Sequence, residues 1–190
     1  KQNRIDGFIC PGHVSAVIGL RPYRKIAERF NIPCVVAGFE PLDILAAVRA
    51  LIDMINSREA GVQNLYPRAV RENGNPRARK TVDEVFSVRD SRWRGLGSIG
   101  ESGYFLRPKF LKFDAGAVLR PPVEESRPDP RCRCGEILKG VLTPPECPAF
   151  GEGCTPRQPL GPCMVPSEGT CAAWYRYQGK RGLKVSAPDI

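Results

Sequence analysis

Short apolar runs alternate with helix-like segments over the first 60 residues of the chain. Residues 5–10 (IDGFIC) and 32–39 (IPCVVAGF) are rich in β-branched and aromatic residues, as is typical of buried strands. Residues 22–30 and 41–58 instead repeat apolar positions at helical spacing. In the second of these segments, apolar residues share one broad face: Leu42, Leu45, Ala46, Val48, Leu51, Ile52 and Ile55. This alternation is the βαβ pattern, and it predicts an α/β fold with a parallel sheet.

The loops that follow the two predicted strands carry the first candidate chemistry. In a parallel sheet both loops lie at the same edge, where binding sites are commonly found. Cys10 and His13, in the first loop, could form an activated thiol with its base, although Cys10 also fits a small buried residue at a strand end. Polar loop residues are harder to explain by packing, so we take His13 and Glu40 as candidate catalytic residues of these loops. Cys34 lies inside the second strand and is expected in the core.

The middle of the chain is less regular. VQNLYPRAV, after Gly61, reads as a further strand or a crossing loop, and GNPRARKTVDEVFSVRD as a helix that begins near Asn75. The glycine-rich WRGLGSIGESG has no phosphate-binding motif, so its glycines are expected to form turns around an ordered Trp93. The proline-rich RPPVEESRPDPR reads as a linker. We therefore predict an α/β domain over residues 1–120 and a linker with a cysteine-rich domain over residues 121–190.

Composition narrows the class of protein. With 190 residues, 42% of them hydrophobic and 26% charged, the chain can bury a core of ordinary size. No apolar run approaches the roughly 20 residues that cross a bilayer, so a soluble, cytoplasmic protein is expected. The net charge of +9 is spread among acidic residues rather than gathered in one tract. We therefore expect neither nucleic acid nor membrane as a partner.

Six of the eight cysteines lie between Cys132 and Cys171, in a segment full of proline and glycine. Their spacing is C-x-C-x12-C-x6-C-x8-C-x7-C, and the segment has too few apolar residues in a row to close a core of its own. Zinc sites usually contain C-x2-C pairs, which are missing here, and the only histidine is His13. An even number of cysteines also permits disulfides. An iron–sulfur cluster needs four thiolates that approach from different directions, and the spacing leaves all three possibilities open.

Longer strings along almost the entire chain resemble a known family. The strings, in chain order, are CPGHVSAVIGLRPY, PCVVAGFEPLDIL, NLYPRAV, WRGLGSIGESGYFLRP, CRCGEILKG, PPECPAFGEGCTP and PLGPCMVPSEGTCAAWYRY. They resemble the second half of the HypD family of hydrogenase maturation proteins. The resemblance implies a second α/β domain followed by an iron–sulfur domain. None of the cysteines matches the family's N-terminal iron-handling cysteines, so a fragment that lacks them is expected.

The resemblance also implies a function and partners. HypD-like proteins act with HypC as the scaffold on which the iron of nickel–iron hydrogenases acquires cyanide and carbon monoxide, and the cyanide comes from HypE. The expected cofactors are therefore a [4Fe-4S] cluster and, in the full-length family protein, a transient iron that carries these ligands. The resemblance thus implies that the protein is a redox-active scaffold for metallocluster assembly rather than a conventional enzyme.

Four of the six clustered cysteines are expected to hold the cluster. Cys132 and Cys134 are only two residues apart, so one of them is expected as a ligand and the other as a nearby redox thiol. Our predicted ligands are Cys134, Cys147, Cys154 and Cys171, which leaves Cys132 and Cys163 as a dithiol. The alternatives are a cluster-dependent thiol–disulfide oxidoreductase and a zinc-stabilised protein-interaction module.

Overall fold

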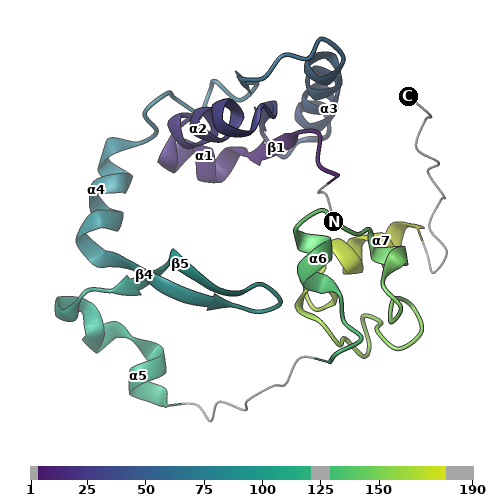
Figure 1. The fold of residues 1–190 in the computed structure, drawn as a ribbon. Helices are drawn as coiled ribbons and strands as arrows, with labels where there is room; N and C mark the ends of the chain where they lie inside the picture. Colours follow the sequence, from purple (N-terminus) through teal and green to yellow (C-terminus); the bar gives the residue numbers. More distant parts are fainter. Residues whose placement is uncertain (1–3, 121–128, 179–190) are drawn as a thin grey trace. The chain divides into compact units, whose positions relative to one another are not determined.

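The computed structural model of the protein describes residues 4–120 and 129–178, which form two compact units. The α/β unit comprises Ile5–Ser87 and Leu106–Lys112. The cysteine unit comprises Val88–Phe105 and the described residues from Phe113 onward, together with Arg4. Figure 1 shows the first unit in purple and blue and the cysteine-rich segment in green and yellow. Residues 121–128, on which the predicted linker and domain boundary fall, lie outside the described residues.

A parallel sheet of three strands forms the centre of the α/β unit. The strands β1 (Phe8–Pro11), β2 (Cys34–Ala37) and β3 (Val62–Asn64) are hydrogen-bonded in the order β1-β2-β3. Every residue of β2 is buried, as the uninterrupted apolar run CVVA requires of a central strand. The predicted α/β fold with a parallel sheet is confirmed.

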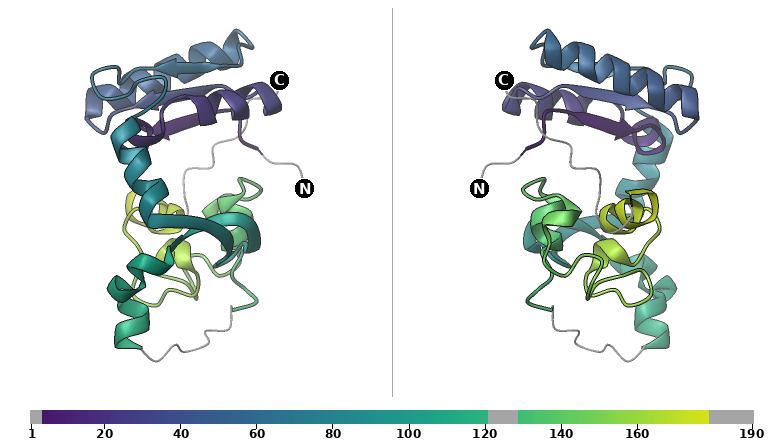
Figure 2. Two further views of the ribbon diagram at one scale, coloured as in Figure 1. Left: turned by 90° about the vertical axis from the view of Figure 1, so that its left-hand side faces the viewer. Right: turned by 90° about the vertical axis from the view of Figure 1, so that its right-hand side faces the viewer.

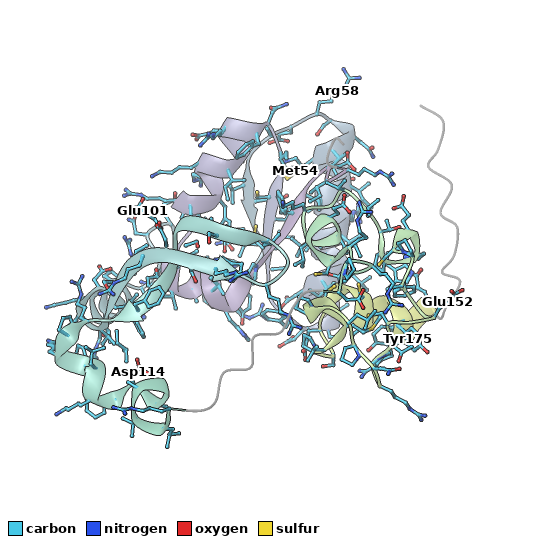
Figure 3. The ribbon with its side chains drawn as sticks, turned by 60° about the horizontal axis from the view of Figure 1, so that its bottom comes forward. Met54, Arg58, Glu101, Asp114, Glu152 and Tyr175 are labelled. Carbon is cyan, nitrogen blue, oxygen red and sulfur yellow. The ribbon has the colours of Figure 1, made fainter. Side chains whose placement is uncertain are left out.

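Helices pack on both faces of this sheet. They are α1 (Gly12–Ile18), α2 (Arg21–Phe30) and α3 (Pro41–Asn56), and α3 runs along the sheet in the two views of Figure 2. One face buries Cys10, Leu20, Ala27, Cys34, Val36 and Val70. The other buries Val35, Ala37, Ala47 and Met54, the last of which is labelled in Figure 3. Alternate residues of β2 thus serve opposite layers.

The broad apolar face predicted for α3 is mostly not buried. The helix instead buries Ala47 and Met54, and of the predicted face Leu51 is half-buried. The rest of the predicted face is exposed: Leu42, Leu45, Ala46, Val48, Ile52 and Ile55. A helix of 16 residues is about 24 Å long. A strand of four residues covers only about 13 Å, so the small sheet cannot cover the whole apolar surface of α3.

The segment after the sheet contains a capped helix and a β-ribbon. Helix α4 (Pro76–Val85) begins where predicted, and the side chain of Asn75 accepts hydrogen bonds from the first-turn backbone amides. The strands β4 (Phe86–Trp93) and β5 (Gly97–Leu106) then pair, so the predicted helix ends earlier than expected. Trp93 is anchored as its Nε1 donates to the Ser102 hydroxyl at 2.7 Å. The segment closes with η1 (Pro108–Phe113) and α5 (Ala115–Leu119).

Loops dominate the cysteine-rich segment. Its regular elements are short: α6 (Cys134–Leu138), η2 (Pro144–Glu146), η3 (Pro162–Met164) and α7 (Thr170–Gln178). At η2, the side chains of Thr143 and Glu146 form a capping box that fixes the turn before Cys147. Within residues 4–120 and 129–178, no helix is both long and apolar enough to cross a membrane.

Candidate functional site

All six clustered cysteines line one pocket in the cysteine unit. Cys134 opens α6, Cys147 follows η2, Cys163 lies in η3 and Cys171 lies in the first turn of α7. The pocket is lined by Cys132, Cys134, Cys147, Cys154, Cys163 and Cys171, together with Ile137, Ala149, Phe150, Gly161 and Met164. Cys132 is half-buried and the other five are buried. The structure therefore brings together every cysteine that the sequence placed in this segment.

The cysteines are also the core of their unit. Five of them make up half of its buried cluster, beside Ile137, Ala149, Phe150, Met164 and Ala172, and Cys132 packs against it. Met164 is almost fully buried, with 1% of its surface exposed. At Gly161, a side-chain Cβ would collide with the sulfur of Cys132. Glycine at this position thus lets the backbone pass directly beside the Cys132 thiol.

Several sulfur atoms are in contact with one another. Cys163 Sγ and Cys171 Sγ are 3.1 Å apart, which is a hydrogen bond and not a disulfide. Cys134 contacts both Cys132 and Cys163. The backbone amide of Leu160 points at the Cys154 sulfur at 3.3 Å. An amide in this position stabilises a thiolate or a metal-bound sulfur.

Burial and contacts between sulfur atoms shift the pKa values of Cys134, Cys163 and Cys171. Burial raises the pKa of Cys134 to about 12, with further increases from Cys132 and Cys163. The hydrogen bond with Cys171 has the opposite effect on Cys163 and lowers its pKa to about 7, while the pKa of Cys171 rises. The nearby cations do not compensate, because Arg131 is paired with Asp129 at 2.8 Å and Arg133 with Glu136. Several thiolates in this pocket therefore need positive charge from a bound group.

The donor set of the pocket suits soft metals bound by sulfur. Among residues 4–120 and 129–178, no three side chains of His, Cys, Asp or Glu are arranged around one point as ligands of a single metal ion. A cluster of several irons needs a wider arrangement of ligands, because each thiolate binds a separate iron at the edge of the cluster. Six thiols around one pocket fit the donor chemistry of such a cluster.

A second group of polar residues lies at the edge of the sheet. His13, in the first turn of α1, packs its ring 4.6 Å from the ring of Phe39, and both side chains are exposed. Glu40 precedes α3 and is also exposed. The structure therefore places both predicted residues at the C-terminal edge of the strands. Nothing in the geometry assigns either of them a chemical step.

Sequence reasoning missed Arg68, which lies at the same edge. Its guanidinium binds the Asp43 carboxylate at 2.7 Å, lies 3.9 Å from Glu40 and is stacked 4.3 Å above the Tyr66 ring. Arg68 follows β3, which has only three residues and no clear apolar pattern. The signal that could have found it is NLYPRAV, whose position after a third parallel strand places it beside the other two loops.

Known proteins resemble this chain over most of its length. A family model named HypD, described as "Hydrogenase formation hypA family", matches residues 1–178. The hydrogenase maturation factor HypD of Escherichia coli K12 is 49% identical over 178 residues, which are 93% of this chain and 48% of that protein. Proteins of the same name from Cupriavidus necator H16 and Rhizobium leguminosarum are 46% and 45% identical over 177 and 187 residues; they cover 91% and 98% of this chain, and 46% and 48% of their own lengths. The chain thus spans about half the length of these curated relatives.

Proposed function

The chain belongs to the HypD family of hydrogenase formation proteins, and we propose that it supplies the electron-transferring part of a hydrogenase maturation scaffold. The observation that carries this proposal is the convergence of six cysteines on one pocket. In this proposal the pocket holds a [4Fe-4S] cluster, and the cluster supplies electrons one at a time for reductive attachment of ligands to iron. The partners are a HypC-like chaperone and a HypE-like cyanide donor. The transient iron that carries cyanide and carbon monoxide is cargo of the full-length family protein.

The electrostatics of the pocket support a cluster. Five buried thiols are costly to ionise together, and the neighbouring arginines are already paired with carboxylates. Ferric and ferrous irons supply the missing positive charge and accept thiolate ligands. The Leu160 amide, which points at Cys154, and the apolar side chains around the pocket supply the hydrogen bond and the dry surroundings that tune such a group.

We weigh two assignments of the six cysteines, one predicted from the sequence and one suggested by the contacts. In both, Cys147, Cys154 and Cys171 bind iron. The assignment predicted from sequence adds Cys134 as the fourth ligand and keeps Cys132 with Cys163 as the dithiol. The contact between Cys134 and Cys163 favours the other assignment, in which Cys132 and Cys134 exchange roles. In that assignment Cys132 is the fourth ligand and Cys134 pairs with Cys163.

The sheet edge of the α/β unit supplies the second part of the proposal. His13 and Glu40 remain our proposed residues for contact with cargo or partner, and Arg68 joins them. Because Asp43 and the Tyr66 ring hold the guanidinium in place, Arg68 can present fixed N–H donors to an anionic or carbonyl-containing group.

One observation favours a second function, a cluster-dependent thiol–disulfide oxidoreductase. Cys163 touches two other thiols and has a lowered pKa of about 7. It could therefore act as the attacking thiolate in disulfide exchange. Turnover of small disulfides by the purified protein, without any support of hydrogenase maturation, would favour this function over the scaffold.

Metal analysis after anaerobic purification tests the cofactor. We expect about four irons and four sulfides per chain, with a broad visible absorption that bleaches on reduction. Cys147→Ser, Cys154→Ser and Cys171→Ser should each lose most of the iron. Cys34→Ser, a buried cysteine of the α/β unit, is the matched control and should keep it. Bound zinc without colour would support the interaction module instead and refute the electron-transfer role.

The same measurement decides between the two ligand assignments. If Cys132 is the fourth ligand, Cys132→Ser loses iron while Cys134→Ser keeps the cluster and loses only the redox thiol. The reverse result restores the assignment predicted from sequence.

Maturation itself can be tested in a chimera in which this chain replaces the 178 aligned residues of the E. coli relative. We expect the chimera to restore hydrogenase activity to cells that lack the relative, and Cys171→Ser to abolish this rescue. An unchanged rescue by the Cys171→Ser chimera would contradict the proposed role of the pocket.

A further inference from the structure

One flank of α3 carries an exposed apolar seam. It consists of Leu45, Val48, Ile52 and Ile55, with 65%, 39%, 51% and 37% of their surfaces exposed. We call these four residues the α3 seam. Their spacing of three, four and three residues repeats the a and d positions of a heptad, which is the pattern of a helix that packs against another helix. Next to the seam on the solvent side, Arg49 and Asp53 form an ion pair at 3.8 Å.

Contacts on either side of α3 show that the α3 seam lies toward β1. A Cβ on Gly7, just before β1, would lie 2.7 Å from Leu51 Cδ1, so this leucine faces the β1 side. At 100° per residue, Val48 and Ile55 stand next to Leu51 and farther from the sheet. The opposite flank belongs to β3, because Asp43 reaches Arg68 there.

The edge of the sheet continues this apolar surface. β1 is an edge strand among the described residues, since β2 is its partner and β3 lies beyond β2. Ile9 is in register with Val35, whose side chain packs in the α3 layer, and 41% of Ile9 is exposed. The α3 seam and Ile9 therefore lie on the same side of the sheet, at the edge where another element can be added. Soluble proteins seldom leave such a surface open.

We propose that the α3 seam and Ile9 form the docking face for an amphipathic α-helix from the half of the HypD family protein that lies outside the aligned range. The family relatives are about twice as long as the range they share with this chain. A helix in the same polypeptide as its docking face has a high effective concentration, which favours docking even on a small seam. The heptad spacing selects a helix as the occupant. The proposal is independent of the cysteine pocket and of the cofactor.

The test compares the same substitutions in two proteins. Ile52→Glu and Leu45→Glu are made in the 190-residue chain and in the chimera with the E. coli relative. Leu111→Glu, at another exposed apolar residue of the same unit, is the matched control. In the 190-residue chain, we expect all three variants to keep the melting temperature within about 1 °C. In the chimera, we expect the two seam variants to melt at least about 3 °C lower and the control to be unchanged. Hydrogen exchange should show faster exchange of the α3 amides in the same two variants.

Three results would overturn the proposal. Equal melting of seam and control variants in the chimera would show that nothing docks there. A similar loss in the 190-residue chain would mean that residues of this chain already cover the seam. A dimer of the 190-residue chain that Ile52→Glu dissociates in size-exclusion chromatography would identify a second copy as the occupant. If the chimera does not fold, Glu is introduced into the intact E. coli relative at the residues aligned with Ile52 and Leu111, and the same difference is expected.

Discussion

Gly161→Ala is the sharpest probe of the cysteine pocket. The backbone of Gly161 is extended (φ −127°, ψ 158°), so alanine can adopt it without strain. The new methyl group would collide with the sulfur of Cys132, whereas the Cβ and sulfur of Cys134 would lie at an ordinary 3.5 Å. Because the obstructing atom is the end of a side chain, the Cys132 thiol can turn away. The substitution should therefore displace one thiol and leave the fold intact.

The free energies involved are small and nearly cancel. A change of the Cys132 side chain to a poorer rotamer costs about 0.5–1.5 kcal/mol. Replacing glycine by alanine stabilises the folded state by about 0.4–1 kcal/mol, because it restricts the unfolded chain. We therefore expect the free energy of unfolding of the metal-free protein to change by less than about 1 kcal/mol.

Alkylation followed by mass spectrometry measures the displacement directly. Cys132 should react several times faster with iodoacetamide in metal-free Gly161→Ala than in the unsubstituted protein, and the other five pocket cysteines should react as before. Gly153→Ala, where the nearest atom to a new Cβ belongs to the flexible Arg131 side chain at 3.5 Å, is the matched control. Unchanged alkylation of Cys132, or a loss of more than about 2 kcal/mol of stability, would refute the reasoning. In the iron-loaded protein, the same variant should lose iron only if Cys132 is a ligand.

Three further predictions follow from the contacts. In the metal-free protein, alkylation of Cys163 should rise with pH around 7 and that of Cys134 only at far more alkaline pH, because the thiolate is the nucleophile and the two pKa values are about 7 and about 12; equal pH profiles in quantitative mass spectrometry would contradict this. Met164→Ala should destabilise the cysteine unit by about 2–5 kcal/mol in denaturant unfolding, since the side chain is almost fully buried; a loss below about 1 kcal/mol would show that the core is loosely packed. Asn75→Ala should destabilise the α/β unit by about 1 kcal/mol through loss of the α4 cap, while Asn75→Asp, which can still accept the amide hydrogen bonds, should not.

The sequence predicted the elements that carry a strong apolar pattern or a clear start signal and missed those that carry neither. The strand Cys34–Ala37 was found because all four residues are apolar and buried, and α4 was found because Asn75 and Pro76 mark its start. The ribbon of β4 and β5 was missed because most of its residues are exposed and give no alternating pattern. Similarly, the apolar pattern of α3 showed a helix but not which part of its surface the small sheet would cover.

The pocket could be predicted only in part. Spacing placed six cysteines in one segment, but loops have no periodicity from which contacts can be derived, so spacing alone did not separate zinc, disulfides and a cluster. The resemblance to a family supplied the cluster as an expectation. Neither source could show that Cys163 touches Cys134 and Cys171, since that depends on how the chain between η2 and α7 folds. Arg68 was missed because β3 is short.

The core of the cysteine unit is made largely of the same sulfur atoms that carry its chemistry. Packing and reactivity are therefore inseparable in this unit, unlike in a protein whose catalytic residues lie on a separate apolar scaffold. Oxidation of Cys154 or Cys171 to a sulfinic acid would place a charged, larger group in the interior. Exposure to oxygen would thus act on this unit as a denaturant does, and the lifetime of the folded protein would depend on how oxidising its surroundings are.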